Sequence, residues 1–183
     1  RHFRTKEFLM RQIDKMAELK MNRLHLHLTD AAGWRLEVES YPRLTSYAAW
    51  RTPHDWKGWW YGDRTFLDEG TEGASGGYLT KEEARELVKY AADRYVTIIP
   101  EIEMPGHSDE VLAAYPELRC SHMPERQGDL CIGKEATFEM MQAILDEVIE
   151  IFPSEYIHIG GDEASKESGN LCEDGQRRRR EKG

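Results

Sequence analysis

Three amphipathic helices, each followed within a few residues by an apolar strand, most constrain how this chain can fold. Apolar side chains at helical spacing predict helices over residues 5–20, 80–95 and 135–151. Strand-like runs follow them at residues 23–29, 96–102 and 156–159. Repeated helix–strand units connect through right-handed crossovers, so this order favours a parallel sheet covered by helices. The sequence therefore predicts an α/β fold.

The same spacing predicts which side chains of the helices face the core. Thr80 with Glu83 three residues later is a capping-box sequence, which indicates where the second helix begins. Pro153 indicates where the third helix ends. The side chains expected to be buried are Phe8, Leu9, Ile13, Met16 and Leu19 in the first helix, Ala84, Leu87, Val88, Ala91 and Tyr95 in the second, and Phe138, Met141, Ile144, Leu145, Val148 and Phe152 in the third.

Composition and length exclude several classes of protein. The 183 residues include 25 Lys and Arg against 34 Asp and Glu, which gives a formal net charge of −9. Nucleic-acid binding needs a basic face, and a membrane span needs a run of about 18 apolar residues, so the sequence favours neither. The chain is shorter than the roughly 250 residues of a complete (β/α)₈ barrel. Arg1, His2 and Phe3 are predicted to end a strand that begins earlier, so we expect both ends to be cut.

Polar side chains follow the predicted strands at the points where the strands end. The ends of the four successive strands carry, in order, Arg1, Asp30, His107 and the pair Asp162 and Glu163. Because the carboxyl ends of parallel strands meet at one edge of a sheet, we expect these five side chains to share a site.

The Gly160-Gly161-Asp162-Glu163 run explains how two adjacent carboxylates can reach one cleft. Neighbouring strand residues face opposite sides unless the strand ends or is distorted. Two glycines permit that distortion and let a ligand approach the backbone closely. The alternative is that Asp162 or Glu163 caps the next helix. A phosphate-binding loop is excluded, because the two acids would repel the phosphate.

The histidines of the first strand allow two interpretations. His25 and His27 lie two residues apart and so share one face of the strand. With His107, His158 and Asp162 they could assemble a divalent-metal site. Both lie in the middle of the strand, before its end. Inward side chains at such positions of a barrel usually pack in layers, so the sequence favours packed core histidines. His158 is expected to support the acidic pair.

Two further groups carry alternatives. The five tryptophans all lie in a long excursion over residues 31–77, and long loops are often functional. Trp50 and Trp56 are expected in a satellite core, whereas others could line a carbohydrate subsite. The arginine run at residues 177–180 is either an anion-binding patch or, as the sequence favours, part of a solvated helix.

The three cysteines, Cys120, Cys131 and Cys172, form no C-x-x-C pair. Their spacing therefore indicates neither a metal site nor a redox site. Cys120 and Cys131 are either buried free thiols or, in an oxidising compartment, a disulfide.

Several segments are recognisable together as motifs. They are Arg1-His2-Phe3, residues 22–30 with Gly33-Trp34-Arg35, residues 100–108 and residues 158–163. In this order they resemble the β-N-acetylhexosaminidases of glycoside hydrolase family 20. The resemblance implies a partial TIM (β/α)₈ barrel, from the end of strand 1 through the start of helix 4. Residues 1–183 would then be the N-terminal half of the catalytic barrel.

The resemblance also implies a mechanism. In the resembling enzymes the 2-acetamido oxygen of the substrate attacks the anomeric carbon, which gives an oxazolinium intermediate and retention of configuration. Glu163 would be the general acid and then the base, and Asp162 would orient the acetamido group. His107 and Asp30 would form a relay behind Glu163, and Arg1 would bind sugar hydroxyls.

The implied reaction releases terminal β-linked N-acetylglucosamine or N-acetylgalactosamine from oligosaccharides or glycoconjugates, with no cofactor and no metal. A secreted or periplasmic location is implied as well. The 183-residue piece alone is expected to be inactive, because half a barrel leaves open sheet edges and half a pocket. Two alternatives remain, a metal-dependent barrel hydrolase and a non-catalytic carbohydrate-binding remnant.

Overall fold

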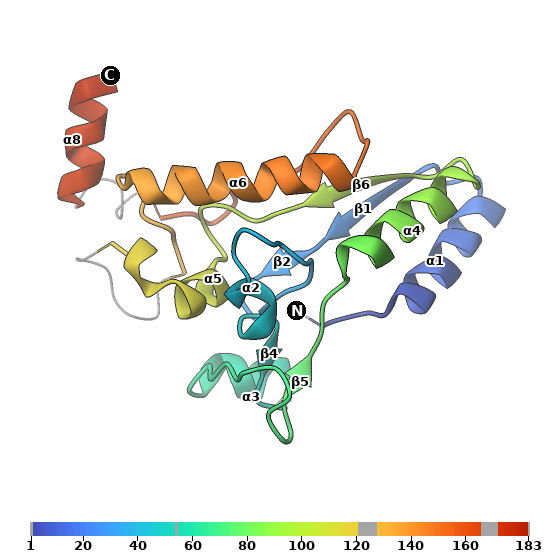
Figure 1. The fold of residues 1–183 in the computed structure, drawn as a ribbon, viewed down its shortest axis with the longest axis horizontal. Helices are drawn as coiled ribbons and strands as arrows, with labels where there is room; N and C mark the ends of the chain where they lie inside the picture. The colour runs from blue at the N-terminus through green and yellow to red at the C-terminus, as the bar shows by residue number, and fades with distance from the viewer. Residues whose placement is uncertain (1, 54, 121–127, 166–171, 183) are drawn as a thin grey trace.

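The computed structural model, which describes residues 2–53, 55–120, 128–165 and 172–182, is built around a parallel pair of strands (Figure 1). These are β1 (Arg23–His27) and β6 (Thr97–Glu101), paired in the register Leu24↔Ile98 and His27↔Glu101. The third predicted strand lies parallel beside β6 as a single bridge between His158 and Glu101. The predicted α/β fold with parallel strands is therefore confirmed.

The three long helices begin where the sequence predicts. The Thr5 hydroxyl accepts a hydrogen bond from the Phe8 N–H at the start of α1 (Lys6–Glu18). Both hydrogen bonds of the predicted capping box are present at the start of α4 (Lys81–Ala92). The third helix is α6 (Glu135–Ile151), and it ends before Pro153. Side-chain caps therefore mark the starts of α1 and α4, whereas α6 begins without one.

The helices cover one face of the strand pair. Helix α4 contacts α1, α6 and β6, and the side-by-side course of α1 and α4 is visible in Figure 1. Ile13, Leu87 and Val148 are each 0 % exposed in the resulting core. Leu24 and Leu26 of β1 pack against the same core from the sheet. The buried side chains on this face of the sheet are therefore among those that the helical spacing predicted.

Three expected core residues are exposed, and two of them share a cause. Leu19 is 73 % exposed and Tyr95 is 89 % exposed. Leu19 comes directly after the last residue of α1. Tyr95 lies beyond Ala92, the last residue of α4, and has a left-handed φ of 59°. Helical spacing no longer applies there, so these two predictions are wrong. Phe138 is 36 % exposed on α6, where the Arg178 guanidinium lies 3.9 Å from its ring centroid.

The excursion between β1 and α4 packs its first part against the main core, and its later elements β4, α3 and β5 project from the rest of the molecule (Figure 1). Its elements are β2 (Thr29–Asp30), β3 (Gly33–Trp34), α2 (Arg43–Ser46), β4 (Trp50–Arg51), α3 (Trp56–Tyr61) and β5 (Ser75–Gly76). Trp59 is buried with Phe66 in a satellite core, and Trp56 packs against them as predicted. Trp50 is half-buried, and its indole N–H donates to the Thr45 carbonyl at 2.9 Å. Trp34 belongs to the main core instead.

The remaining described elements connect the sheet edge to the end of the chain. They are α5 (Asp109–Ala114), the 3₁₀ helix η1 (Pro116–Leu118) and α8 (Glu173–Lys182). Arg177 and Arg179 are exposed on α8, so the solvated helix expected for the arginine run is confirmed. His2 and Phe3 are not part of a strand, contrary to expectation, and Arg1 lies outside the described residues. Among the described helices, none combines the length and apolarity that crossing a bilayer requires.

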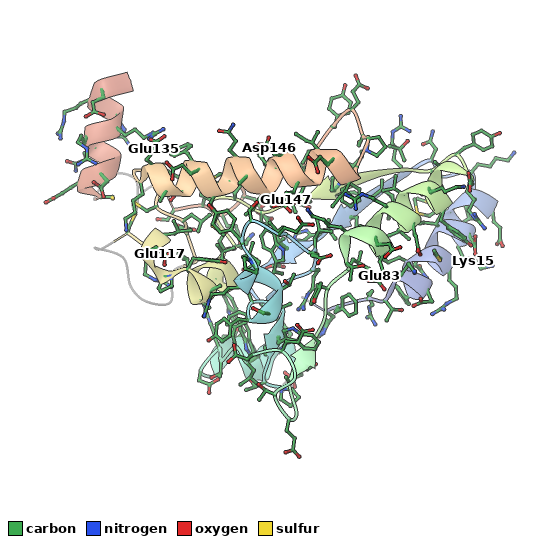
Figure 2. All side chains as sticks on the ribbon, viewed as in Figure 1. Lys15, Glu83, Glu117, Glu135, Asp146 and Glu147 are labelled. Carbon is green, nitrogen blue, oxygen red and sulfur yellow. The ribbon has the colours of Figure 1, made fainter. Side chains whose placement is uncertain are left out.

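A buried ion pair joins the helices to the excursion. Lys81 Nζ donates to the Glu147 carboxylate at 2.7 Å, and Figure 2 shows Glu147 on the side of α6 that faces the fold. The backbone N–H groups of Glu39 and Ser40 also donate to this carboxylate, at 2.8 and 2.9 Å. Burial opposes the charged form, but hydrogen bonds from Lys81 and Ser40 outweigh it and lower the pKa of Glu147 to about 2. The Lys81 ammonium, the Glu147 carboxylate and the two backbone N–H groups therefore all have hydrogen-bond partners.

Candidate active site

The Gly160–Glu163 run has the distorted backbone that its glycines predict. Gly160, Gly161 and Glu163 have left-handed φ values of 65°, 96° and 54°. A Cβ on Gly160 would lie 1.9 Å from Oε2 of Glu103, whereas a Cβ on Gly161 would have no neighbour closer than 3.9 Å. Position 160 therefore requires glycine for both conformation and space. Glu163, at the end of this turn, contacts His107 in the segment that follows β6.

His107 bridges two carboxylates at this edge of the sheet. Its Nε2 lies 3.1 Å from Oε2 of Glu163, and its Nδ1 lies 3.4 Å from Oε1 of Glu103. The Glu163 side chain is 81 % exposed, whereas that of Glu103 is 2 % exposed. One carboxylate is therefore open to a ligand, and the other anchors the imidazole from inside the protein.

The pKa values of Glu103 and His107 are shifted in directions that suit proton transfer. Burial, with the nearby charge of Asp162, raises the pKa of Glu103, while His107 acts in the opposite direction. Burial opposes a charged His107, but hydrogen bonds to Glu163 and Glu103 outweigh it and raise the pKa of the imidazole. Oε2 of Glu103 has no hydrogen-bond partner within the described part of the chain. Perturbed groups of this kind collect where proton transfer occurs.

Three of the predicted site residues are brought together. Ligand atoms of Asp162, His107 and Glu103 lie within 4.8 Å of one another, and Glu163 contacts His107. Asp30, on β2, is half-buried and raises the pKa of His107 through its charge. Sequence reasoning missed Glu103, although its position four residues before His107 in the segment after β6 is a usable signal.

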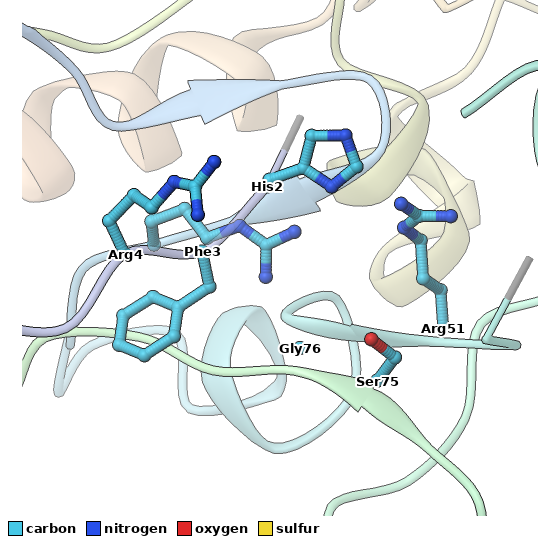
Figure 3. A pocket seen from close by; sticks show the side chains of 7 residues that line it. His2, Phe3, Arg4, Arg51, Ser75 and Gly76 are labelled. Atoms are coloured by element: carbon cyan, nitrogen blue, oxygen red, sulfur yellow. The ribbon is translucent and has the colours of Figure 1, made fainter. Parts of the chain in front are cut away.

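Arg1 lies outside the described residues, and His2, the residue after it, lines a cavity of about 290 Å³. The cavity is lined by His2, Phe3, Arg4, Arg35, Arg51, Ser75 and Gly76. In Figure 3, Arg4 and Arg51 lie on opposite sides of it. Guanidinium groups offer several fixed donors, which suits recognition of oxygen-rich ligands.

His25, His27 and His158 converge on the buried carboxylate of Glu101. The nearest nitrogen-to-oxygen distances are 2.6, 3.0 and 3.0 Å, respectively. The three imidazoles are 51 %, 44 % and 50 % exposed, so the prediction that His25 and His27 are packed core histidines is wrong. They lie on the sheet face opposite the helices, where Glu101 holds them. His158 also accepts a hydrogen bond from the Gly160 N–H at 3.0 Å, in line with its expected supporting position.

Three sets of histidines and carboxylates near this edge could hold a divalent cation. Their ligand atoms lie within 4.8 Å of one another in the sets His25, Glu101 and His158; His27, Glu101 and Glu103; and Glu103, His107 and Asp162. Nitrogen and carboxylate ligands suit Zn²⁺ and similar ions. The third set includes His107, the imidazole in contact with Glu163, so a metal there would compete with that contact.

Comparison with known sequences identifies the family. The model of the glycosyl hydrolase family 20 catalytic domain matches residues 1–183. A beta-hexosaminidase from Porphyromonas gingivalis is 41 % identical over 191 residues, which covers 100 % of this chain and 22 % of that protein. One from Akkermansia muciniphila is 39 % identical over 181 residues, covering 94 % of this chain and 34 % of that protein. The chain thus spans about a third or less of these relatives.

Solved structures give the same assignment. A beta-N-acetylhexosaminidase from Bacteroides fragilis superposes with a TM-score of 0.77 at 38 % identity, covering 99 % of this chain and 32 % of that one. An exo beta-N-acetylglucosaminidase from Vibrio harveyi, solved with N-acetylglucosamine, has a TM-score of 0.82 at 30 % identity. That match covers 98 % of this chain and 28 % of the other. The chain therefore belongs to glycosyl hydrolase family 20, with its residues matching the catalytic domain.

Proposed function

We propose that the whole protein is a β-N-acetylhexosaminidase. It would release terminal β-linked N-acetylglucosamine or N-acetylgalactosamine from oligosaccharides or glycoconjugates, with retention of configuration. The nucleophile would be the 2-acetamido oxygen of the substrate, which forms an oxazolinium intermediate. Family membership supports glycoside hydrolysis as the reaction class, and the names of the relatives indicate an N-acetylhexosamine as the sugar that is released.

The contact between His107 and Glu163 is the observation that carries this proposal. The 3.1 Å separation couples an exposed carboxylate to an imidazole whose pKa is raised. A general acid must be within reach of the substrate and must regain its proton in each cycle. Glu163 is the exposed member, so it would protonate the leaving oxygen and then activate water.

The neighbouring residues would divide the remaining tasks. Asp162 would orient the acetamido group and stabilise the positive charge that develops on it. Asp30, acting through its charge, and Glu103, in contact with Nδ1, would hold the imidazole of His107 in its bridging position. Arg1 would bind sugar hydroxyls.

The architecture and setting follow from the same proposal. Residues 1–183 would form the N-terminal half of a (β/α)₈ catalytic barrel, in which β1, β6 and the segment 156–159 are consecutive parallel strands. Active sites of such barrels lie at the carboxyl ends of the strands, where the acidic cluster is found. A secreted or periplasmic location would give the enzyme access to glycoconjugates.

The test is release of 4-nitrophenol from 4-nitrophenyl N-acetyl-β-glucosaminide by the whole protein. The matching β-glucoside, which lacks the acetamido group, should be hydrolysed at least about 1,000-fold more slowly, because it has no internal nucleophile. Glu163→Gln should lower kcat/KM about 100-fold or more. Similar rates on both sugars would contradict the proposed mechanism.

A control variant separates catalysis from a general effect of charge. Glu155 is exposed and lies just before the same strand segment, so Glu155→Gln should leave kcat/KM unchanged. A bound metal ion that is lost together with turnover in His25→Ala would instead favour a metal-dependent hydrolase using the His25, Glu101 and His158 set. Binding of N-acetylglucosamine without turnover would indicate a non-catalytic protein.

A further inference from the structure

The three cysteines, far apart in sequence, come together in a cluster of their own. Cys120, Cys131 and Cys172 are 3 %, 0 % and 3 % exposed, and they pack against one another, separately from the main core. Their sulfur atoms all lie within 4.8 Å of one another. Spacing rules fail here because the fold, and not a C-x-x-C motif, assembles the cluster.

The sulfur positions resemble those of thiolates around a metal. The Cys131 and Cys172 sulfurs are 3.3 Å apart, in contact and not bonded. Two thiolates at about 2.3 Å from a tetrahedral zinc ion are about 3.8 Å apart, so small movements would complete the geometry. A disulfide would use two of the sulfurs and leave the third without a role.

Backbone N–H groups already point at the sulfurs. The N–H of Gly133 donates to the Cys131 sulfur, and those of Gly175 and Asp174 donate to the Cys172 sulfur. N–H donors of this kind stabilise a thiolate, and a cluster of buried thiolates needs a cation to offset its charge.

The backbone around the cluster is closely fitted. The Arg119↔Leu130 bridge holds Cys120 near Cys131, and the Thr137 hydroxyl of α6 donates to the Cys131 carbonyl at 2.8 Å. A Cβ on Gly133 would lie 2.2 Å from the backbone nitrogen of Gly175. This close approach keeps the start of α8 against the connection between η1 and α6.

We propose that Cys120, Cys131 and Cys172 bind one zinc ion, or a similarly thiophilic divalent ion, through three thiolates, with water in the fourth position. Soft sulfur ligands favour such ions over Mg²⁺ or Ca²⁺. The ion would tie α8, which follows the Glu163 segment, to the loop that leads into α6. Its role is structural, because the cluster lies outside the acid–base residues.

The test is the metal content of the whole protein, purified without chelator and under reduced conditions. The protein should contain zinc, and Cys131→Ser should lose about one equivalent of it, since three ligands act as a unit. Cobalt substitution should give thiolate-to-cobalt charge-transfer absorption that Cys131→Ser abolishes. Met140→Leu removes a buried sulfur of α6 outside the cluster and should keep both signals.

Gly133→Ala removes no ligand but should weaken zinc binding at least about tenfold in a competition with a chelator, because it separates the two backbones. If the variants fail to fold, the zinc content and the cobalt spectrum of the unmodified protein decide the question. Absence of zinc together with absence of the cobalt band would overturn the proposal. A Cys131–Cys172 disulfide in the purified protein, found by non-reducing peptide mapping, would overturn it equally.

Discussion

The two faces of the β1–β6 strand pair differ in how their groups are satisfied. On the helix side, Ile13, Leu87 and Val148 are fully buried, and the charged Glu147 has donors around it. On the opposite side and at the adjoining edge, Glu101 gathers three half-exposed imidazoles. The buried Glu103 there keeps one oxygen without a partner among the described residues. One face is arranged for stability, and the other retains polar groups for chemistry.

The first prediction tests the helix face, where the largest loss of stability is expected. Leu87→Ala should lower the free energy of unfolding by about 3 kcal/mol, because it leaves a cavity in a closed core. Leu19→Ala, the same change at a side chain that is 73 % exposed, should cost less than about 0.5 kcal/mol. Chemical denaturation of the whole protein measures both, and equal losses would mean that the helix face is not the closed core.

The second prediction tests the polar edge with two adjacent glycines. Gly160→Ala and Gly161→Ala share a left-handed backbone, but only the first places its Cβ against Glu103, at 1.9 Å. Displacing Glu103 moves His107 away from Glu163, so Gly160→Ala should lower kcat/KM about 100-fold. Gly161→Ala should lower it no more than about tenfold. Equal effects on kcat/KM would show that backbone strain, and not the Glu103 contact, matters at position 160.

A third prediction compares one carboxylate from each face. Glu147→Gln should destabilise the protein by about 2 kcal/mol at neutral pH, because it leaves Lys81 buried beside a neutral partner. The lowered pKa of Glu147 means that its contribution is present above about 4.5, its ordinary value, and is lost as the pH falls toward about 2. The difference between the variant and the unmodified protein should therefore shrink in acid.

Glu103→Gln should behave in the opposite way. Burial raises the pKa of Glu103, so its charged form weakens the folded state at high pH, and a neutral replacement removes that cost. Its stability should equal or exceed that of the unmodified protein at about pH 8, while the pH profile of kcat/KM changes because His107 loses a charged neighbour. Thermal unfolding across pH measures both variants, and a destabilised Glu103→Gln would reverse the assignment of the two faces.

The sequence predicted the helix face well because its contacts repeat locally. The capping box at Thr80 and the apolar spacing of α1, α4 and α6 depend on neighbours within a few residues. Those predictions failed at Leu19 and Tyr95, where the helices had already ended. Strand-end logic also identified His107, Asp162 and Glu163 as neighbours.

Most of the missed contacts depend on long-range pairing. The three histidines meet at Glu101 only once β1, β6 and residue 158 lie side by side. The cysteine cluster likewise needs three separate loops. Local periodicity contains no information on contacts between distant segments. Spacing rules for metal ligands detect only ligands that lie within one segment of the sequence.

The most direct test of Glu163 as the general acid is how the loss of kcat/KM in Glu163→Gln depends on the leaving group of the substrate. Glu163→Gln should lower kcat/KM about 1,000-fold or more for an N-acetylglucosaminide with an alkyl aglycone, which needs protonation. The loss should be at least about tenfold smaller for the 2,4-dinitrophenyl glycoside, whose leaving group departs without a proton. Equal losses on the two substrates would contradict the role of Glu163 and, with it, the account of this site.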